Sequence, residues 1–273
     1  MNKKTKGNAF LYIGGAITLV MTVLILVGLV WTPYSPTEMD PSAMTCPPSL
    51  AHLLGTDNFG RDIFSRVLEG AGTSFLIAVC VVAIGCAAGT LMGALCGYYG
   101  GIPDLVLTRV CDAITAFPSF LLALVVVSVV GRGAYNVIFA LGILFIPSFA
   151  RIVRGEFARC RDLNYIRSAR LMGVGTARLM FCHILPNTLP VLFSALTIGF
   201  NNAILSEASM SFLGIGIQPP YASLGSMLSD SQTYLNSAPW YALSVGGTIA
   251  LLILGFSLLS EGLQRRSRQG REV

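Results

Sequence analysis

The chain has 273 residues, of which 54% are hydrophobic and only 11% are charged, and its formal net charge is +5. Soluble domains carry about 25% charged residues. This composition excludes an ordinary soluble enzyme or binding domain, and it predicts an all-α protein that crosses a membrane several times. The seven cysteines form no CxxC pair, and we interpret them as small apolar residues rather than a disulfide or zinc framework.

The first element is an apolar run over residues 10–31, preceded by the lysine-containing residues 1–9. The run is longer than the apolar region of a secretory signal, and no small-residue cleavage site closes it before Trp31. Because a membrane span needs about 20 apolar residues, we expect a first transmembrane helix that is retained.

Residues 32–73 form the only long segment predicted to lie outside the cytoplasm. Its first half is rich in proline and should be extended. In its second half, Asp57 with Arg61 and Asp62 with Arg66 are acid-to-base pairs at i, i+4, which predict an exposed helix. This helix either caps the bundle or contacts an incoming ligand-carrying protein.

Residues 74–259 contain five further predicted spans, which makes six in all. The five apolar runs cover residues 74–96, 113–130, 137–150, 189–212 and 239–259. The run 137–150 is short for a span. The second span carries a glycine at every fourth position, a smooth face on which another helix can pack closely; these are Gly85, Gly89, Gly93 and Gly97.

Three polar or helix-breaking residues within the spans are candidates for a translocation path. Pro118 interrupts the third span, where a kink either lines a cavity or only serves packing. Asn201 and Asn202 lie within the fifth span, and either face a polar pathway or form hydrogen bonds between helices. Because adjacent helical positions point about 100° apart, only one asparagine can face the pathway squarely. Glu207 is expected nearer the outer interface.

The distribution of positive charge predicts the orientation. With a cytoplasmic N-terminus, every lysine and arginine except Arg61, Arg66 and Arg132 falls in a cytoplasmic segment. This bias follows the positive-inside rule and places the tail, residues 260–273, in the cytoplasm. It also accounts for the net charge without nucleic acid as a partner.

The cytoplasmic loop 151–188 contains a polar island between apolar segments, predicted as two short helices broken by glycine. Tyr165, Ala169 and Met172 are spaced i, i+4, i+7, as on one apolar stripe. Gly173 and Gly175 allow a left-handed turn that ends the first helix. Pro186 is expected to stop the second helix. By periodicity alone, this unit could be an amphipathic loop held on lipid headgroups by its arginines.

The spacing of this loop resembles the "EAA" loop of ABC-importer permeases, which in that family docks into a cleft of the cytoplasmic ATPase. The matching positions are Ala169, Gly173, Leu185 and Pro186. Arg167 stands where the general motif has Glu, and Ser168 where it has Ala. The resemblance implies a coupling loop formed by Tyr165, Arg167, Ser168, Ala169, Met172, Gly173, Leu185 and Pro186.

Three stretches in the same order resemble the dipeptide, oligopeptide and nickel branch of that superfamily. They are Leu54-Gly-Thr-Asp-Asn-Phe-Gly-Arg-Asp-Ile-Phe-Ser-Arg66, His183-Ile-Leu-Pro-Asn187 and Glu207-Ala-Ser-Met-Ser-Phe-Leu-Gly-Ile-Gly216. The resemblance implies a type I ABC-importer permease fold in a prokaryotic inner membrane. It also implies a second homologous permease, two ATPases that hold ATP and Mg²⁺, and an extracytoplasmic substrate-binding protein.

The sequence contains no motif for catalysis or cofactor binding. It has no GxxxxGK[ST] or GxGxxG for nucleotide phosphates, no GxSxG and no HExxH. Its two histidines are too few for a zinc site. We therefore predict a transport subunit for dipeptides or oligopeptides without catalytic, cofactor or metal residues. The alternatives are a nickel or metal-chelate permease and, from another class, a channel or enzyme with a basic surface loop.

Overall fold

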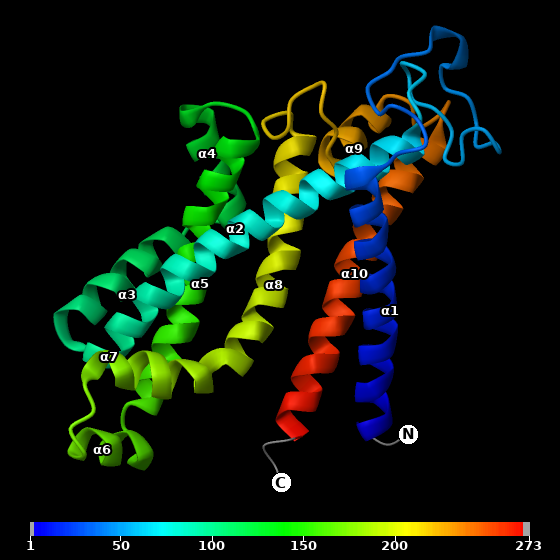
Figure 1. Ribbon diagram of the computed structural model, residues 1–273. Helices are drawn as coiled ribbons and strands as arrows, with labels where there is room; N and C mark the ends of the chain where they lie inside the picture. The colour runs from blue at the N-terminus through cyan, green and yellow to red at the C-terminus, as the bar shows by residue number, and fades with distance from the viewer. Residues whose placement is uncertain (1–2, 270–273) are drawn as a thin grey trace.

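The computed structural model describes residues 3–269, with side chains described from Phe10 to Arg265, as a bundle of helices (Figure 1). Within this range the only strand-type pairing is one isolated β-bridge between Thr56 and Asp62, so the all-α prediction is confirmed. The elements are α1 (Lys3–Val30), the 3₁₀ turn η1 (Pro41–Ala43), α2 (Ile63–Tyr99), α3 (Gly101–Thr115), α4 (Ser119–Val130), α5 (Ala134–Cys160), α6 (Asn164–Leu171), α7 (Thr176–Arg178), the π-helical segment η2 (Leu179–Ile184), α8 (Leu185–Phe212), α9 (Leu224–Gln232) and α10 (Pro239–Gln269).

In the described part of the chain, five helical stretches are long and apolar enough to cross a membrane. The predicted third span, residues 113–130, is not one helix. α3 and α4 meet at a bend of 86° and supply a sixth span only as a broken pair. The break has a simple cause, because Pro118 has ψ 122°, outside the helical region, and proline disfavours helical backbone in the residue before it.

Several helices extend beyond the apolar runs that predicted them. α2 begins at Ile63 instead of residue 74, and α5 runs from Ala134 to Cys160 instead of 137–150. α1 includes Lys3, and α10 continues past residue 259 to Gln269. Hydrophobicity marks the part of a helix that meets lipid, whereas backbone hydrogen bonding continues into polar residues. Residues 1–2 and 270–273, at the ends of the predicted cytoplasmic segments, lie outside the described range.

The predicted glycine face of α2 packs directly against α5. A Cβ on Gly85 would lie 2.8 Å from Phe145 Cβ, and one on Gly89 would lie 2.7 Å from Phe149 Cβ. These distances are too short for any larger side chain, so the two backbones approach as closely as small residues allow. Around this contact, α2, α4, α5 and α8 enclose the larger hydrophobic core. The close packing predicted from the four-residue spacing is confirmed.

α1 and α10 run side by side in opposite directions and form a second packing unit with α2 and α9 (Figure 1). Glycines again allow the approach, since a Cβ on Gly255 would lie 2.9 Å from Ile17 Cγ2, and one on Gly262 would lie 2.7 Å from the backbone of Leu11. Both termini and α6 lie at one end of the bundle, while residues 31–62 and α9 lie at the other. α9, between α8 and α10 in the chain, is the short helix at the end that holds residues 31–62.

The prediction of an exposed helix around Asp57 was wrong, because the chain there is not helical and α2 begins only at Ile63. Residues 56–62 form a turn, in which Asp57 is fully buried and accepts a 2.7 Å hydrogen bond from Arg61 Nε. Asp62 does not pair with Arg66; it caps α2 by accepting from the Ser65 amide at 2.8 Å, and it contacts His52 at 3.0 Å. The i, i+4 spacing was read as helical, but here it reflects a tight turn closed by a carboxylate.

Candidate functional site

The unit formed by α6 and the following turn is closed by Gly173. This glycine has φ +83°, and its amide donates to the Arg170 carbonyl at 3.0 Å, while the Val174 amide donates to the Ala169 carbonyl at 3.2 Å. The left-handed conformation costs a residue with a Cβ about 1–2 kcal/mol, which explains a glycine here. Gly175, in contrast, is the N-cap residue before α7 and has φ −65°, so only one of the two predicted turn glycines adopts the left-handed conformation.

α6 buries a different face from the predicted one. Ile166 and Ala169 face the core, whereas Tyr165 is 42% and Met172 is 77% exposed. The stripe of Tyr165, Ala169 and Met172 was wrong because α6 ends at Leu171, so the helical period does not carry on to Met172. Leu171 is 89% exposed, and α6 therefore presents an apolar tip to solvent.

Two arginines fasten this unit to the end of α2. Arg161 Nη1 donates to two backbone carbonyls, that of Gly97 at 3.4 Å and that of Tyr98 at 3.3 Å. Arg170 Nη2 donates to the Tyr98 hydroxyl at 3.2 Å. Carbonyls in the last turn of a helix lack partners in the helix and attract cations. The sequence analysis missed these anchors, because nothing in the chain order indicates that residue 98 lies beside residue 170.

The remaining residues of the predicted coupling loop lie at the same end of the bundle. Arg167 and Ser168 are exposed on α6, and the Arg167 guanidinium comes no closer than 3.9 Å to Asp162. Asn187 Nδ2 donates to the Tyr165 hydroxyl at 3.1 Å and so ties α8 to α6. Partial burial raises the pKa of the Tyr165 hydroxyl from its ordinary value, and the hydrogen bond from Asn187 opposes this effect.

Pro186 does not stop a helix as predicted. α7, η2 and α8 are continuous from Thr176 to Phe212, and Pro186 lies in the first turn of α8, immediately after the π-helical segment. Proline has no N–H for the carbonyl four residues earlier, and wider π-type turns carry a helix past such a residue. Leu185 is half-buried and begins α8.

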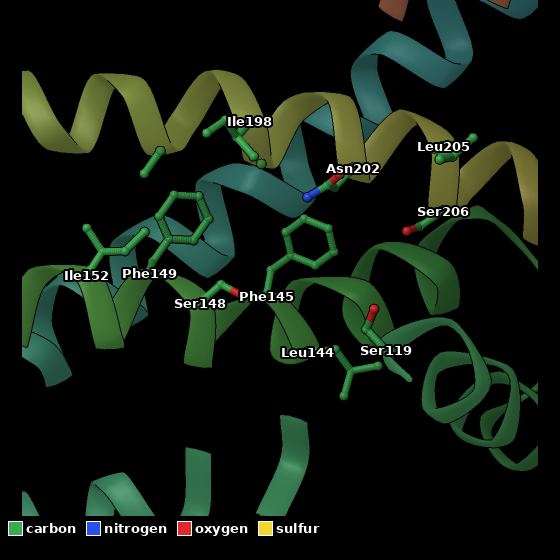
Figure 2. Close-up of a pocket in the computed structure, with 12 residues that line it drawn as sticks. Ser119, Leu144, Phe145, Ser148, Phe149, Ile152, Ile198, Asn202, Leu205 and Ser206 are labelled. Carbon is green, nitrogen blue, oxygen red and sulfur yellow. The ribbon is translucent and has the colours of Figure 1, made fainter. Parts of the chain in front are cut away.

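A cavity of about 490 Å³ lies between α4, α5 and α8 (Figure 2). Asn202 of α8 points across it toward Phe145 of α5, with Ser148 and Ser206 nearby. The described side chains that line it are hydroxyl, carboxamide and apolar groups, and none of them is charged. Such a lining can form hydrogen bonds with a polar solute without holding it by charge.

The two candidate asparagines point to different places. Asn202 lines this cavity and Asn201 does not; Asn201 donates to Ser257 of α10 at 2.8 Å. Both asparagines also line a cavity between α8 and α10. Pro118 does not line the cavity; it sets the break before α4 that brings Ser119 to the cavity wall. Glu207 is buried and accepts a 2.7 Å hydrogen bond from Ser211, away from this cavity.

Residues 89–269, well over half of the chain, match the family described as binding-protein-dependent transport system inner membrane component. The chain belongs to this family. This inner membrane component is therefore an ABC-importer permease, and α6, η2 and α8 all lie within the matched region.

Relatives of the permease match nearly its whole length. It is 37% identical to the dipeptide transport system permease protein DppC of Alkalihalophilus pseudofirmus over 96% of this chain and 86% of the relative. It is also 37% identical to the DppC of Haemophilus influenzae, over 95% and 90%. It is 40% identical to the glutathione transport system permease protein GsiD of Pectobacterium atrosepticum, over 91% and 85%. These relatives are transport permeases, so the chain is a transport subunit and not an enzyme.

Proposed function

We propose that this permease imports short peptides, dipeptides or tripeptides, as one of two homologous subunits that together form the translocation pathway. The names of its relatives support this substrate class. An extracytoplasmic binding protein delivers the peptide, and two cytoplasmic ATPases bind ATP and Mg²⁺ and supply the energy.

The observation that carries the coupling proposal is the exposed tip of α6. A helix end with Leu171 and Met172 in solvent, held rigidly to α2 by Arg161 and Arg170, has the form of a docking element. Large exposed apolar side chains mark interaction surfaces when they are grouped and positioned. We infer that this tip and the exposed Arg167 enter the ATPase cleft, so that movement there is transmitted to α2 and α8.

The proposed pathway uses the cavity between α4, α5 and α8, with Asn202 as its polar contact. Because one wall is open in the single chain, the second permease would complete it. The clustering of positive charge supports placing α6 and both termini in the cytoplasm, and segment 31–62 and α9 outside.

The test is reconstitution of the complete transporter in liposomes, with ATP enclosed in the lumen and the binding protein and labelled peptide added outside. The proposal predicts that the ATPases co-purify with the permease pair and that labelled dipeptide accumulates only with ATP. Accumulation of a nickel chelate without peptide uptake would instead assign the metal branch of the family. Purification without any ATPase, together with ATP-independent flux, would favour a channel.

A further inference from the structure

The end of the bundle opposite α6 contains a second polar cavity, of about 390 Å³, which shares no lining residue with the cavity between α4, α5 and α8. It lies between segment 31–62, the chain after α8, and α9. Its lining includes charges of both signs, Arg61 and Arg66 of segment 31–62 and α2 and Asp230 of α9. We call it the mouth cavity.

The two arginines share a single carboxylate. Asp57 accepts from Arg61 Nε at 2.7 Å and lies 3.5 Å from Arg66 Nε. Both arginines are more than nine-tenths buried, at 7% and 3% exposed. Only one carboxylate among the described residues contacts these two buried guanidinium groups, so a further anion that reached them would be stabilised.

The arginines also retain free donors. Arg66 Nη1 donates to the Pro36 carbonyl at 3.0 Å, but its buried Nε has no hydrogen-bond partner within the described residues. Within the described residues, Nε makes the only side-chain hydrogen bond of Arg61. The Cζ atom of this guanidinium lies over the Phe59 ring, 4.7 Å from its centroid. A fixed guanidinium with unused N–H groups is suited to a carboxylate ligand.

No other carboxylate among the described residues forms an ion pair with Arg61 or Arg66 within 4.0 Å, although Asp230 and Glu69 act on Arg66 at longer range. Asp62 is occupied by His52 and the Ser65 amide, and Glu207, behind the Ser211 wall, accepts from Ser211. Asp230 lines the cavity, and within the described residues it has no ion pair within 4.0 Å. Burial raises the pKa of its carboxyl despite the opposing effect of Arg66 and Arg61, as expected when no cation contacts it directly.

We propose that the mouth cavity binds the charged ends of a short peptide, with the peptide carboxylate at Arg61 and Arg66 and its ammonium group at Asp230. This inference rests on the proposed peptide function and adds a site that selects zwitterions before the uncharged cavity at Asn202. The volume suits a small ligand. Among the described residues, the remaining walls carry no charged side chain. They combine apolar and aromatic groups, among them Phe59, Ile217 and Tyr221, with serine hydroxyls and one carboxamide, and so accept peptide side chains without selecting a charge.

The test is equilibrium binding of radiolabelled alanyl-alanine to the complete transporter in nanodiscs without binding protein. Alanyl-alaninamide lacks the carboxylate, and N-acetyl-alanyl-alanine lacks the ammonium group. Each should compete about tenfold or more weakly than alanyl-alanine, the range expected for one charge-assisted hydrogen-bonded contact. Arg61→Gln should abolish the discrimination against the amide, and Asp230→Asn should abolish that against the acetylated peptide.

Two controls separate binding from folding. Glu38→Gln removes an exposed acid from the same segment and should leave both discriminations intact. Asp230→Asn touches neither Asp57 nor its arginines, so it tests the site even if Arg61→Gln disturbs segment 31–62.

The possible results are distinct. Equal competition by all three peptides, or discrimination that survives both substitutions, overturns the mouth site while peptide uptake by the reconstituted transporter still supports the proposed function. In a separate measurement, peptide-free binding protein is added to the same nanodiscs. If Arg61→Gln and Asp230→Asn weaken its binding but leave the peptide competition unchanged, the proposal is overturned and the surface is a protein docking site. Absence of uptake for every peptide tested overturns both proposals together.

Discussion

Replacement of Gly173 by valine should uncouple the permease from its ATPases. The turn after α6 requires φ +83° at this residue, and that conformation costs a residue with a Cβ about 1–2 kcal/mol and a β-branched one more. A Cβ at Gly173 would meet no atom within 4 Å. Backbone strain is therefore the only direct effect, and the substitution should alter the turn without disturbing the core.

A strain of about 1.4 kcal/mol changes the population of the native turn relative to an alternative about tenfold. The chain offers a matched control in Gly175, which also has open space around its Cβ position but has φ −65°. Gly175→Ala should therefore be nearly neutral. Gly173→Asn should be milder than Gly173→Val, since asparagine tolerates the left-handed region better than other residues with a Cβ.

The assay is ATP hydrolysis by the reconstituted complex, measured with and without peptide-loaded binding protein. We expect Gly173→Val to lower the stimulated rate several-fold while assembly and the basal rate persist, with Gly175→Ala close to the original protein. Full stimulation and normal uptake in Gly173→Val would refute the idea that the geometry of this turn positions a docking helix.

Three further predictions test topology, pathway and packing. In intact cells, an impermeant thiol reagent should label Cys46, and the exposed Cys182 should react only after the cytoplasmic face is opened; the reverse pattern would invert the orientation. Asn202→Leu should lower peptide uptake without loss of assembly, whereas Asn201→Leu should keep uptake and lose about 0.5–1.5 kcal/mol of stability with its hydrogen bond to α10; equal uptake by both variants would remove Asn202 from the pathway. Gly89→Val would place a side chain 2.8 Å from the Ile146 carbonyl and should cost about 1–3 kcal/mol or more, seen as a lower unfolding temperature in detergent; an unchanged temperature would contradict the close contact of α2 and α5.

The parts of the fold that follow from local pattern could be predicted from the sequence. Apolar runs located the spans, and the four-residue glycine spacing in α2 indicated a close helix contact. Helix ends could not be placed in this way, because α5 continues through Arg151 and Arg154 into polar surroundings. Pro186 was misjudged for a related reason, since proline ends a regular α-helix but not one that passes through a π-helical segment.

In the candidate site, only the features that depend on neighbouring residues in the sequence could be predicted. Gly173 was found from its position after a short helix, and the divergence of Asn201 and Asn202 follows from helical geometry. The anchors Arg161 and Arg170 could not be found, because they bind the end of α2, far away in sequence. The buried arginines at the mouth cavity were likewise read as exposed helix partners, since burial depends on contacts between distant segments.

Photocrosslinking at the tip of α6 tests the central claim most directly. A photoreactive residue placed at Met172 should crosslink to an ATPase subunit in the assembled transporter. The control is the same residue at Leu243, which is equally exposed on α10, at 74% against 77%, but lies near the opposite end of the bundle and should yield no such product. Crosslinking to the ATPase from Met172 alone is the predicted result, and its absence from Met172 in an active complex would contradict the account.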